Sequence, residues 1–197
     1  MTDGHRSTRI PMKDGMQNWD CLEAIDQEAF ITAIDKACAT GPLPVELPTT
    51  AQSTNSTAKM LTVADLQRMD MEKAKFSEKL PRYVFIDGFM LLNDPEVVKR
   101  LDLAFILRAT LEVVRQRRQA RGGYQTIEGS WQDPPQYIEQ IMWPEYVRYH
   151  SQLFCNGDVE GKPKEFGSPV NQFSPEPNMD LSSTAQWVVR TMLSSEK

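Results

Sequence analysis

The sequence predicts an α/β fold in which helices cover both faces of a parallel sheet. Two short, unbroken apolar runs, 83–88 and 103–107, indicate strands that are buried on both faces, because a half-buried strand would alternate polar and apolar residues. Segments with helical periodicity precede and follow these runs. Strands that alternate with helices are typical of a layered domain with right-handed crossovers. A length of 197 residues suits one such domain, 1–197.

The first predicted helix runs from Trp19 to Ala39. One apolar stripe follows its length, made of Leu22, Ile25, Ala29, Phe30, Ala33, Ile34 and Ala37. Asp20, with Glu23 three residues later, predicts a capped start, and Gly41-Pro42 predicts the stop. The following segment, 41–59, is rich in proline, threonine and serine, so we expect a disordered insertion there.

Three further helices are expected after the predicted strands, at 110–121, 135–153 and 181–193. The residues between the last two, 156–180, carry no clear period, and we expect them to be irregular.

Asp87 ends the first predicted strand, and ligands of open α/β sheets bind at the carboxyl ends of strands. In phosphoryl-transfer proteins an acid at this place holds Mg²⁺ directly or through water. The alternative is an Asp-Gly turn that merely ends the strand. The residues alone leave both interpretations open.

Segment 108–121 concentrates positive charge in a chain whose formal net charge is −5. It contains one acid and five arginines, which are Arg108, Arg115, Arg117, Arg118 and Arg121. Like charges crowded on one helix repel each other unless an anion is present, and guanidinium groups match phosphate oxygens well. Together with the glycine break at Gly122-Gly123, this pattern predicts a mobile lid, 108–124, that closes over phosphate. A solvated helix face is the alternative.

Trp19 and Asp20 form a third candidate site. The indole could stack on a flat heterocycle, and the carboxylate could accept hydrogen bonds from ribose hydroxyls. Taken alone, the pair is explained more simply as the N-cap and apolar staple of the helix that follows.

The overall composition excludes several classes of protein. The acidic balance argues against a nucleic-acid or membrane-surface partner, and no apolar run is long enough to span a membrane. Cys21, Cys38 and Cys155 are odd in number and widely spaced, so they are expected to be reduced thiols of a cytoplasmic protein.

Several stretches, in this order and spacing, resemble one family. They are Asp14-Gly15-Met16-Gln17-Asn18-Trp19-Asp20, Phe85-Ile86-Asp87-Gly88-Phe89-Met90-Leu91-Leu92, Arg117-Arg118-Gln119-Ala120-Arg121 with Tyr124, and Asp133-Pro134-Pro135-x-Tyr137 leading to Trp143-Pro144-x-Tyr146. From about Ile10 to Leu153 the chain resembles the nicotinamide riboside kinases, a branch of the uridine-kinase-like P-loop kinases. The resemblance implies a P-loop-kinase-like fold and transfer of the ATP γ-phosphate to the 5′-hydroxyl of nicotinamide riboside, a step of NAD biosynthesis.

Carried over residue by residue, the resemblance implies a substrate site made of Trp19, Asp20, Arg118 and Tyr124. Trp19 and Tyr124 resemble the aromatic residues on the two faces of the nicotinamide ring, and Asp20 and Arg118 resemble the pair that binds the ribose hydroxyls. The implied cofactors are ATP and Mg²⁺. Asp87 would serve the metal ion, and Arg117 and Arg121 would be the catalytic lid arginines near the transferred phosphate.

The chain departs from the family in its phosphate-binding motif and in the stretch that carries the family's general base, which would fall at or before Met1. Phosphate binding needs the motif G-x-x-x-x-G-K-[ST]. The single Gly-Lys pair, Gly161-Lys162, is followed by Pro163, and Asn156 stands where the first glycine would be. We therefore expect the chain to be the C-terminal three quarters of a kinase, incomplete at the N-terminus and inactive as written. The alternatives are a non-catalytic riboside-binding or regulatory protein and a related kinase that acts on another nucleoside.

Overall fold

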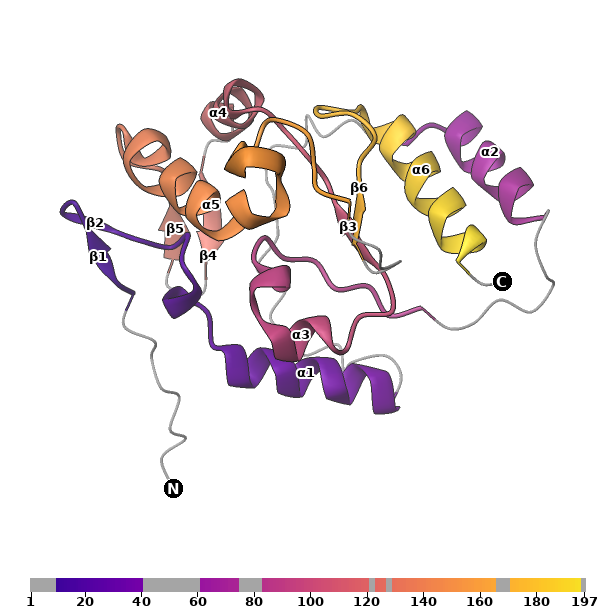
Figure 1. The fold of residues 1–197 in the computed structure, drawn as a ribbon, viewed down its shortest axis with the longest axis horizontal. Coiled ribbons are helices and arrows are strands. Elements are labelled where there is room, and N and C mark those ends of the chain that lie inside the picture. Colours follow the sequence, from indigo (N-terminus) through magenta and orange to yellow (C-terminus); the bar gives the residue numbers. More distant parts are fainter. Residues whose placement is uncertain are drawn as a thin grey trace. The chain divides into compact units, whose positions relative to one another are not determined.

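The computed structural model describes residues 10–40, 61–74, 83–120, 123–126, 129–165 and 171–195. They belong to two compact units, and each unit combines segments that are distant in the sequence (Figure 1). Unit 1 takes its described residues from Met1–Thr49, Val84–Arg100 and Gln132–Val159, and unit 2 from Thr50–Tyr83, Leu101–Trp131 and Glu160–Lys197. The expectation of one domain, 1–197, stays a prediction.

Unit 1 is largely helical. Its elements are strands β1 (Met12–Lys13) and β2 (Met16–Gln17), the short helix η1 (Leu22–Ala24), helix α1 (Gln27–Thr40), η2 (Leu91–Asn93), α3 (Pro95–Val98), the π-helical turn η3 (Ile138–Met142), α5 (Trp143–His150), η4 (Ser151–Leu153) and η5 (Cys155–Gly157). Its core is formed by apolar residues of α1, α3 and the 137–159 segment, and Ile141 and Phe154 are fully buried in it.

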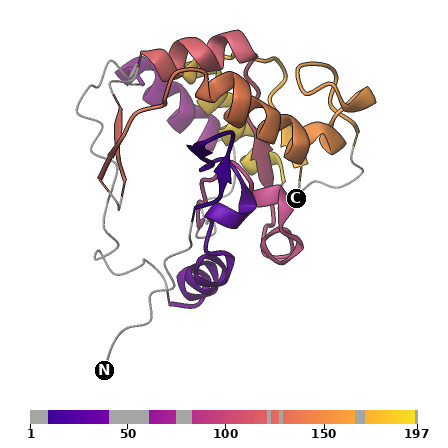
Figure 2. The same cartoon turned by 90° about the vertical axis from the view of Figure 1, so that its left-hand side faces the viewer.

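The antiparallel hairpin β1–β2 precedes the Trp19-Asp20 pair. Its turn, Asp14-Gly15, has positive φ at both residues, 49° and 77°, as the tightest hairpin turns require. Lys13 Nζ donates to Glu145 Oε1 at 2.6 Å, which joins the hairpin to α5, and Figure 2 shows the indigo hairpin beside the orange helix.

A proline explains the π-helical turn before α5. Pro144 occupies the first turn of α5 and has no N–H to donate to the preceding turn. The ladder widens there, and Trp143 N donates to Ile138 O, five residues back.

Unit 2 contains two small sheets and three helices among its described residues. The elements are α2 (Val63–Lys73), β3 (Ala104–Ile106), α4 (Leu111–Gln119), β4 (Tyr124–Thr126), β5 (Gly129–Trp131), β6 (Asn171–Phe173) and α6 (Leu181–Ser194). Strand β3 pairs in parallel with β6, and β4 pairs antiparallel with β5. Helix α6 packs on β3 through an edge-to-face contact of Phe105 with Trp187, whose ring centroids are 5.2 Å apart.

Several sequence predictions are confirmed. Strand β3 lies within 103–107, α4 within 110–121, and α6 covers 181–193. The parallel pair β3–β6 and the helices agree with an α/β chain in the broad sense. Among the described helices, none combines the length and the apolarity that crossing a bilayer takes.

The prediction of a buried strand at 83–88 is wrong. This segment has no regular structure, and the Phe85 side chain is 75% exposed. Aromatic and β-branched residues fit a pleated surface only where a neighbouring strand provides one, and no sheet formed by the described residues includes this segment.

The start of the first helix and the structure of segment 156–180 also differ from the predictions. The first helix begins at Gln27 rather than near Asp20, because Ile25 is extended and Asp26 Oδ1 accepts a hydrogen bond from Ala29 N at 3.0 Å. The segment 156–180, expected to be irregular, contains β6. The predicted disordered insertion 41–59 lies outside the described residues.

Candidate functional site

The Trp19-Asp20 pair lies in a loop that is tied down on both sides. Before it, Asn18 N donates to Pro11 O at 2.7 Å, which closes the base of the hairpin. Asn18 is buried, and its Oδ1 accepts a hydrogen bond from Asp20 N at 3.1 Å. Cys21 Sγ donates to Asn18 O at 3.3 Å. A loop held in this way presents its side chains in a fixed direction.

Tyr137, which follows the Pro135-Gln136 turn, binds both residues of the pair. Its hydroxyl accepts from Trp19 N at 3.1 Å and donates to Asp20 Oδ2 at 2.8 Å. Only 1% of Tyr137 is exposed. The carboxylate predicted to bind ribose is therefore a partner of a buried phenol, and it is not the helix cap that the residues alone favoured.

A second tyrosine binds the next residues of the same loop. Tyr149 of α5 accepts from Leu22 N at 3.5 Å and donates to Glu23 Oε2 at 3.2 Å. The Glu23 backbone amide, followed by the side chains of Cys21 and Tyr149, holds the pKa of Glu23 below its usual value. Burial raises the pKa of Tyr149. Each of the two tyrosines thus binds the backbone amide of one loop residue and the carboxylate of the residue that follows it.

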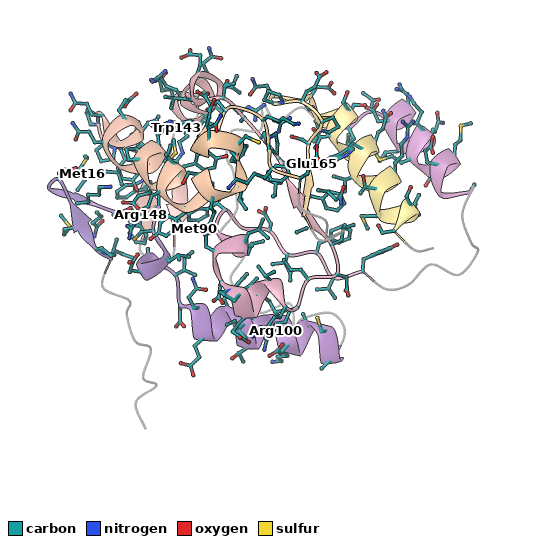
Figure 3. All side chains as sticks on the ribbon, in the orientation of Figure 1. Met16, Met90, Arg100, Trp143, Arg148 and Glu165 are labelled. Atoms are coloured by element: carbon teal, nitrogen blue, oxygen red, sulfur yellow. The ribbon has the colours of Figure 1, made fainter. Side chains whose placement is uncertain are left out.

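A buried carboxylate joins the hairpin to the helix behind this loop. Glu145 is 2% exposed, and its two oxygens accept from Lys13 Nζ at 2.6 Å and Arg148 at 3.2 Å. The Arg148 guanidinium also lies 5.0 Å from the centre of the Tyr149 ring. In Figure 3, the labelled Arg148 and Trp143 lie along α5, and Met16 marks the hairpin.

Asp87 also belongs to unit 1, in the exposed segment that lacks regular structure. The segment is tied to α5 two residues later, where His150 Nε2 lies 2.9 Å from Phe89 O while its Nδ1 lies 2.9 Å from Tyr146 O. Burial lowers the pKa of His150, against the opposing effect of these two carbonyls.

Asp87 alone is not a complete metal site. In the described part of the chain no group of three or more acidic, histidine or cysteine side chains could hold a metal ion. A single exposed carboxylate fits Mg²⁺ only in the way nucleotide enzymes use it, with substrate phosphates and water as the other ligands.

The predicted lid arginines belong to unit 2, and two of the five are structural. The Arg108 guanidinium donates to the carbonyls of Gly161, Ser174 and Pro175 at 2.8 to 3.4 Å, and Arg115 pairs with Glu112 at 2.7 Å. These two arginines therefore have partners within unit 2, and the lid at 108–124 stays a prediction.

Of the other three arginines of the predicted lid, the structure describes two. Arg117 and Arg118 lie in the last turn of α4, where Arg117 is exposed and a positive charge also complements the helix dipole. Arg121 lies outside the described residues. The backbone of Tyr124 lies in β4, opposite Trp131, and its side chain is outside the described part.

The structure thus brings Trp19 and Asp20 together in unit 1, which also holds Asp87, whereas Arg117 and Arg118 lie in unit 2. Convergence of the two sets on one ligand stays a prediction. Sequence reasoning assigned no role to Tyr137 or Tyr149, although Tyr137 was part of a recognised stretch. Burial of a tyrosine hydroxyl, which needs a partner, is the signal that could have found them.

Comparisons with known proteins identify close relatives. The chain is 34% identical over 187 residues to a nicotinamide riboside kinase of Schizosaccharomyces pombe, covering 94% of this chain and 79% of the relative. It is 32% identical over 189 residues to the enzyme of the same name from Saccharomyces cerevisiae, covering 93% and 78%. A nicotinamide riboside kinase of Eremothecium gossypii is 32% identical over 163 residues. No protein-family model and no solved structure matches the chain.

Proposed function

Because the chain belongs to the nicotinamide riboside kinase family, we propose that it binds nicotinamide riboside as the acceptor of a phosphoryl group from ATP. The product is the 5′-mononucleotide, and the reaction belongs to NAD biosynthesis. Identity of 34% spread over 94% of the chain is the observation that carries this proposal, since so long a match includes every stretch in which candidate site residues were recognised.

The proposed acceptor site starts from the loop after β2. Trp19 packs on the nicotinamide ring with Tyr124 on its other face, and Asp20 accepts hydrogen bonds from the ribose hydroxyls beside Arg118. A carboxylate has lone pairs for about four hydrogen bonds, so the bond from Tyr137 leaves it able to accept others.

The proposed phosphoryl transfer depends on charge. Arg117 and Arg121 stabilise negative charge on the transferred group, as guanidinium groups do in other phosphoryl-transfer enzymes. Asp87 contributes one carboxylate toward Mg²⁺, and a bound Mg²⁺ would neutralise the phosphate oxygens. The parallel sheet with helices on both faces and the cytoplasmic location expected from the sequence are parts of the same proposal.

A second candidate function is riboside binding without catalysis. The observation that favours it is the loop of Trp19 and Asp20, which Tyr137 binds at 3.1 and 2.8 Å, because riboside binding needs this loop but not a motif for the nucleotide phosphates. Both functions require the same acceptor site and differ in whether phosphate is transferred.

Isothermal titration calorimetry of the purified chain with nicotinamide riboside and with uridine tests the acceptor site. We expect nicotinamide riboside to bind and Asp20→Ala to weaken its binding at least about tenfold, because a charged hydrogen-bond acceptor is lost. Glu28→Ala, an exposed acid on α1, is the control and should bind like the wild type. Binding of uridine but not of nicotinamide riboside would contradict the proposed substrate.

A phosphoryl-transfer assay with MgATP separates the two candidate functions. Formation of the mononucleotide supports the kinase, and riboside binding without its formation supports the non-catalytic binding protein.

A further inference from the structure

We propose that Tyr137 is a positioning residue for the acceptor site, which fixes the Asp20 carboxylate in the orientation that binds the ribose. This inference rests on the proposed function and adds a residue that has no assigned role. It starts from three described residues of unit 1, Trp19, Asp20 and Tyr137, whose bonds lie at 2.8 and 3.1 Å.

The direction of the Tyr137 hydroxyl follows from its two partners. A backbone N–H can only donate, so the phenol oxygen must accept from Trp19 N. The phenolic proton then has to point at Asp20 Oδ2. An O–H bond to an ionised carboxylate is charge-assisted and stronger than a neutral one. One hydroxyl therefore fixes both the backbone of the first residue and the side chain of the second.

The tyrosine itself has little freedom. Its ring is buried, and its amide N donates to Pro134 O at 3.1 Å. Gln136, directly before it, has φ 66°, a left-handed conformation that is uncommon for a residue with a side chain. Behind it, Ile138 and Ile141 of the π-helical turn are buried as well. The hydroxyl is thus presented from a rigid base, as a positioning residue requires.

Tyr149 provides a matched control within the same unit. It binds Leu22 N and the Glu23 carboxylate in the same pattern, at 3.5 and 3.2 Å, one step further along the loop. If the two tyrosines only attached the loop to the helix, the loss of either hydroxyl should change riboside binding to a similar extent. If Tyr137 acts through Asp20, only its hydroxyl should matter for the riboside.

The experiment compares Tyr137→Phe and Tyr149→Phe in the full chain, each alone and combined with Asp20→Ala. The dissociation constant for nicotinamide riboside is measured by calorimetry, and urea unfolding confirms that each variant is folded. Phenylalanine keeps the ring that fills the buried site. We expect Tyr137→Phe to raise the dissociation constant about tenfold and Tyr149→Phe to change it less than about twofold. In the Asp20→Ala background, Tyr137→Phe should have no further effect, because the group through which it acts is gone.

The outcomes separate this inference from the proposed function. If the wild type does not bind nicotinamide riboside, the proposed function fails and this inference fails with it. If the wild type binds and Asp20→Ala weakens binding, the function stands. Equal effects of the two tyrosine variants, or an effect of Tyr137→Phe that persists without Asp20, would then overturn the positioning role alone.

Discussion

Two glutamates of unit 1 show how burial decides what an ion pair contributes. Glu145 pairs with a lysine and an arginine at 2.6 and 3.2 Å, and Glu96 pairs with Lys99 at 2.6 Å and Arg100 at 3.4 Å. The chemistry is the same, but the Glu145 side chain is 2% exposed and that of Glu96 is 54% exposed. Water screens the second set of charges and barely reaches the first carboxylate.

We therefore expect Glu145→Ala to lower the free energy of unfolding by about 2 kcal/mol, because two charge-assisted hydrogen bonds are lost and the hairpin loses its link to α5. No buried charge is left behind, since the side chains of Lys13 and Arg148 are 36% and 62% exposed. Glu96→Ala should cost less than about 1 kcal/mol. Urea unfolding followed by tryptophan fluorescence measures both values. A Glu145 variant as stable as the Glu96 variant would show that the buried pair contributes no net stability.

At the level of elements, sequence periodicity located helices better than strands. The stripes at 110–121 and 181–193 correspond to α4 and α6, because an amphipathic helix carries its own hydrogen bonds and needs only one apolar face. The run 83–88 has the composition of a strand, but a strand depends on a neighbour that its own residues cannot specify. The turn Asp14-Gly15 was a local signal for the β1–β2 hairpin that went unused.

Helix α2, which the sequence did not predict, is paired with α6 through one buried carboxylate. Asp65 Oδ1 accepts from Ser182 Oγ at 2.5 Å, and Asp65 Oδ2 accepts from the Thr62 hydroxyl at 2.7 Å and from Thr62 N at 2.9 Å. These bonds, that of Ser182 first, lower the pKa of Asp65 to about 2. They close the capping box of α2 and fasten the helix to α6 at the same time.

Asp65→Asn should consequently destabilise the chain at pH 7 and change its pH dependence. The folded pKa lies below the value of 3.8 for the unfolded chain, so the stability that Asp65 provides is full above pH 3.8 and is lost as the pH falls toward about 2. Unfolding in urea at several values between pH 2 and 7 measures this slope. The wild type should lose more stability than Asp65→Asn over that interval. Asp70→Asn, an exposed acid on the same helix, should follow the wild-type curve.

For the whole molecule, the sequence resemblance identified the family, and the comparisons with the yeast kinases confirm it. The candidate site was predictable only residue by residue. Trp19 and Asp20 could be named from a motif, but the buried phenol that binds them is 117 residues away from Asp20, at a distance that no local pattern encodes. The partners of Arg108 could not be predicted, because they are backbone carbonyls of another segment, which have no signature in the sequence.

The two substrates of the proposed kinase should stabilise the 197-residue chain to different extents. A ligand that binds the folded chain stabilises it by about 2.7 kcal/mol at a concentration a hundred times its dissociation constant. Nicotinamide riboside should stabilise the 197-residue chain in urea unfolding, since the loop that carries Trp19 and Asp20 is held in place. MgATP should stabilise it far less, because the 197 residues contain no phosphate-binding loop motif.

Lys162→Ala is the control for the single Gly-Lys pair. The lysine side chain is 76% exposed, and its Nζ lies 3.7 Å from Glu165 Oε1. Stabilisation by MgATP that equals that of the riboside would contradict the prediction, and its loss in Lys162→Ala would show that Gly161-Lys162 binds phosphate after all.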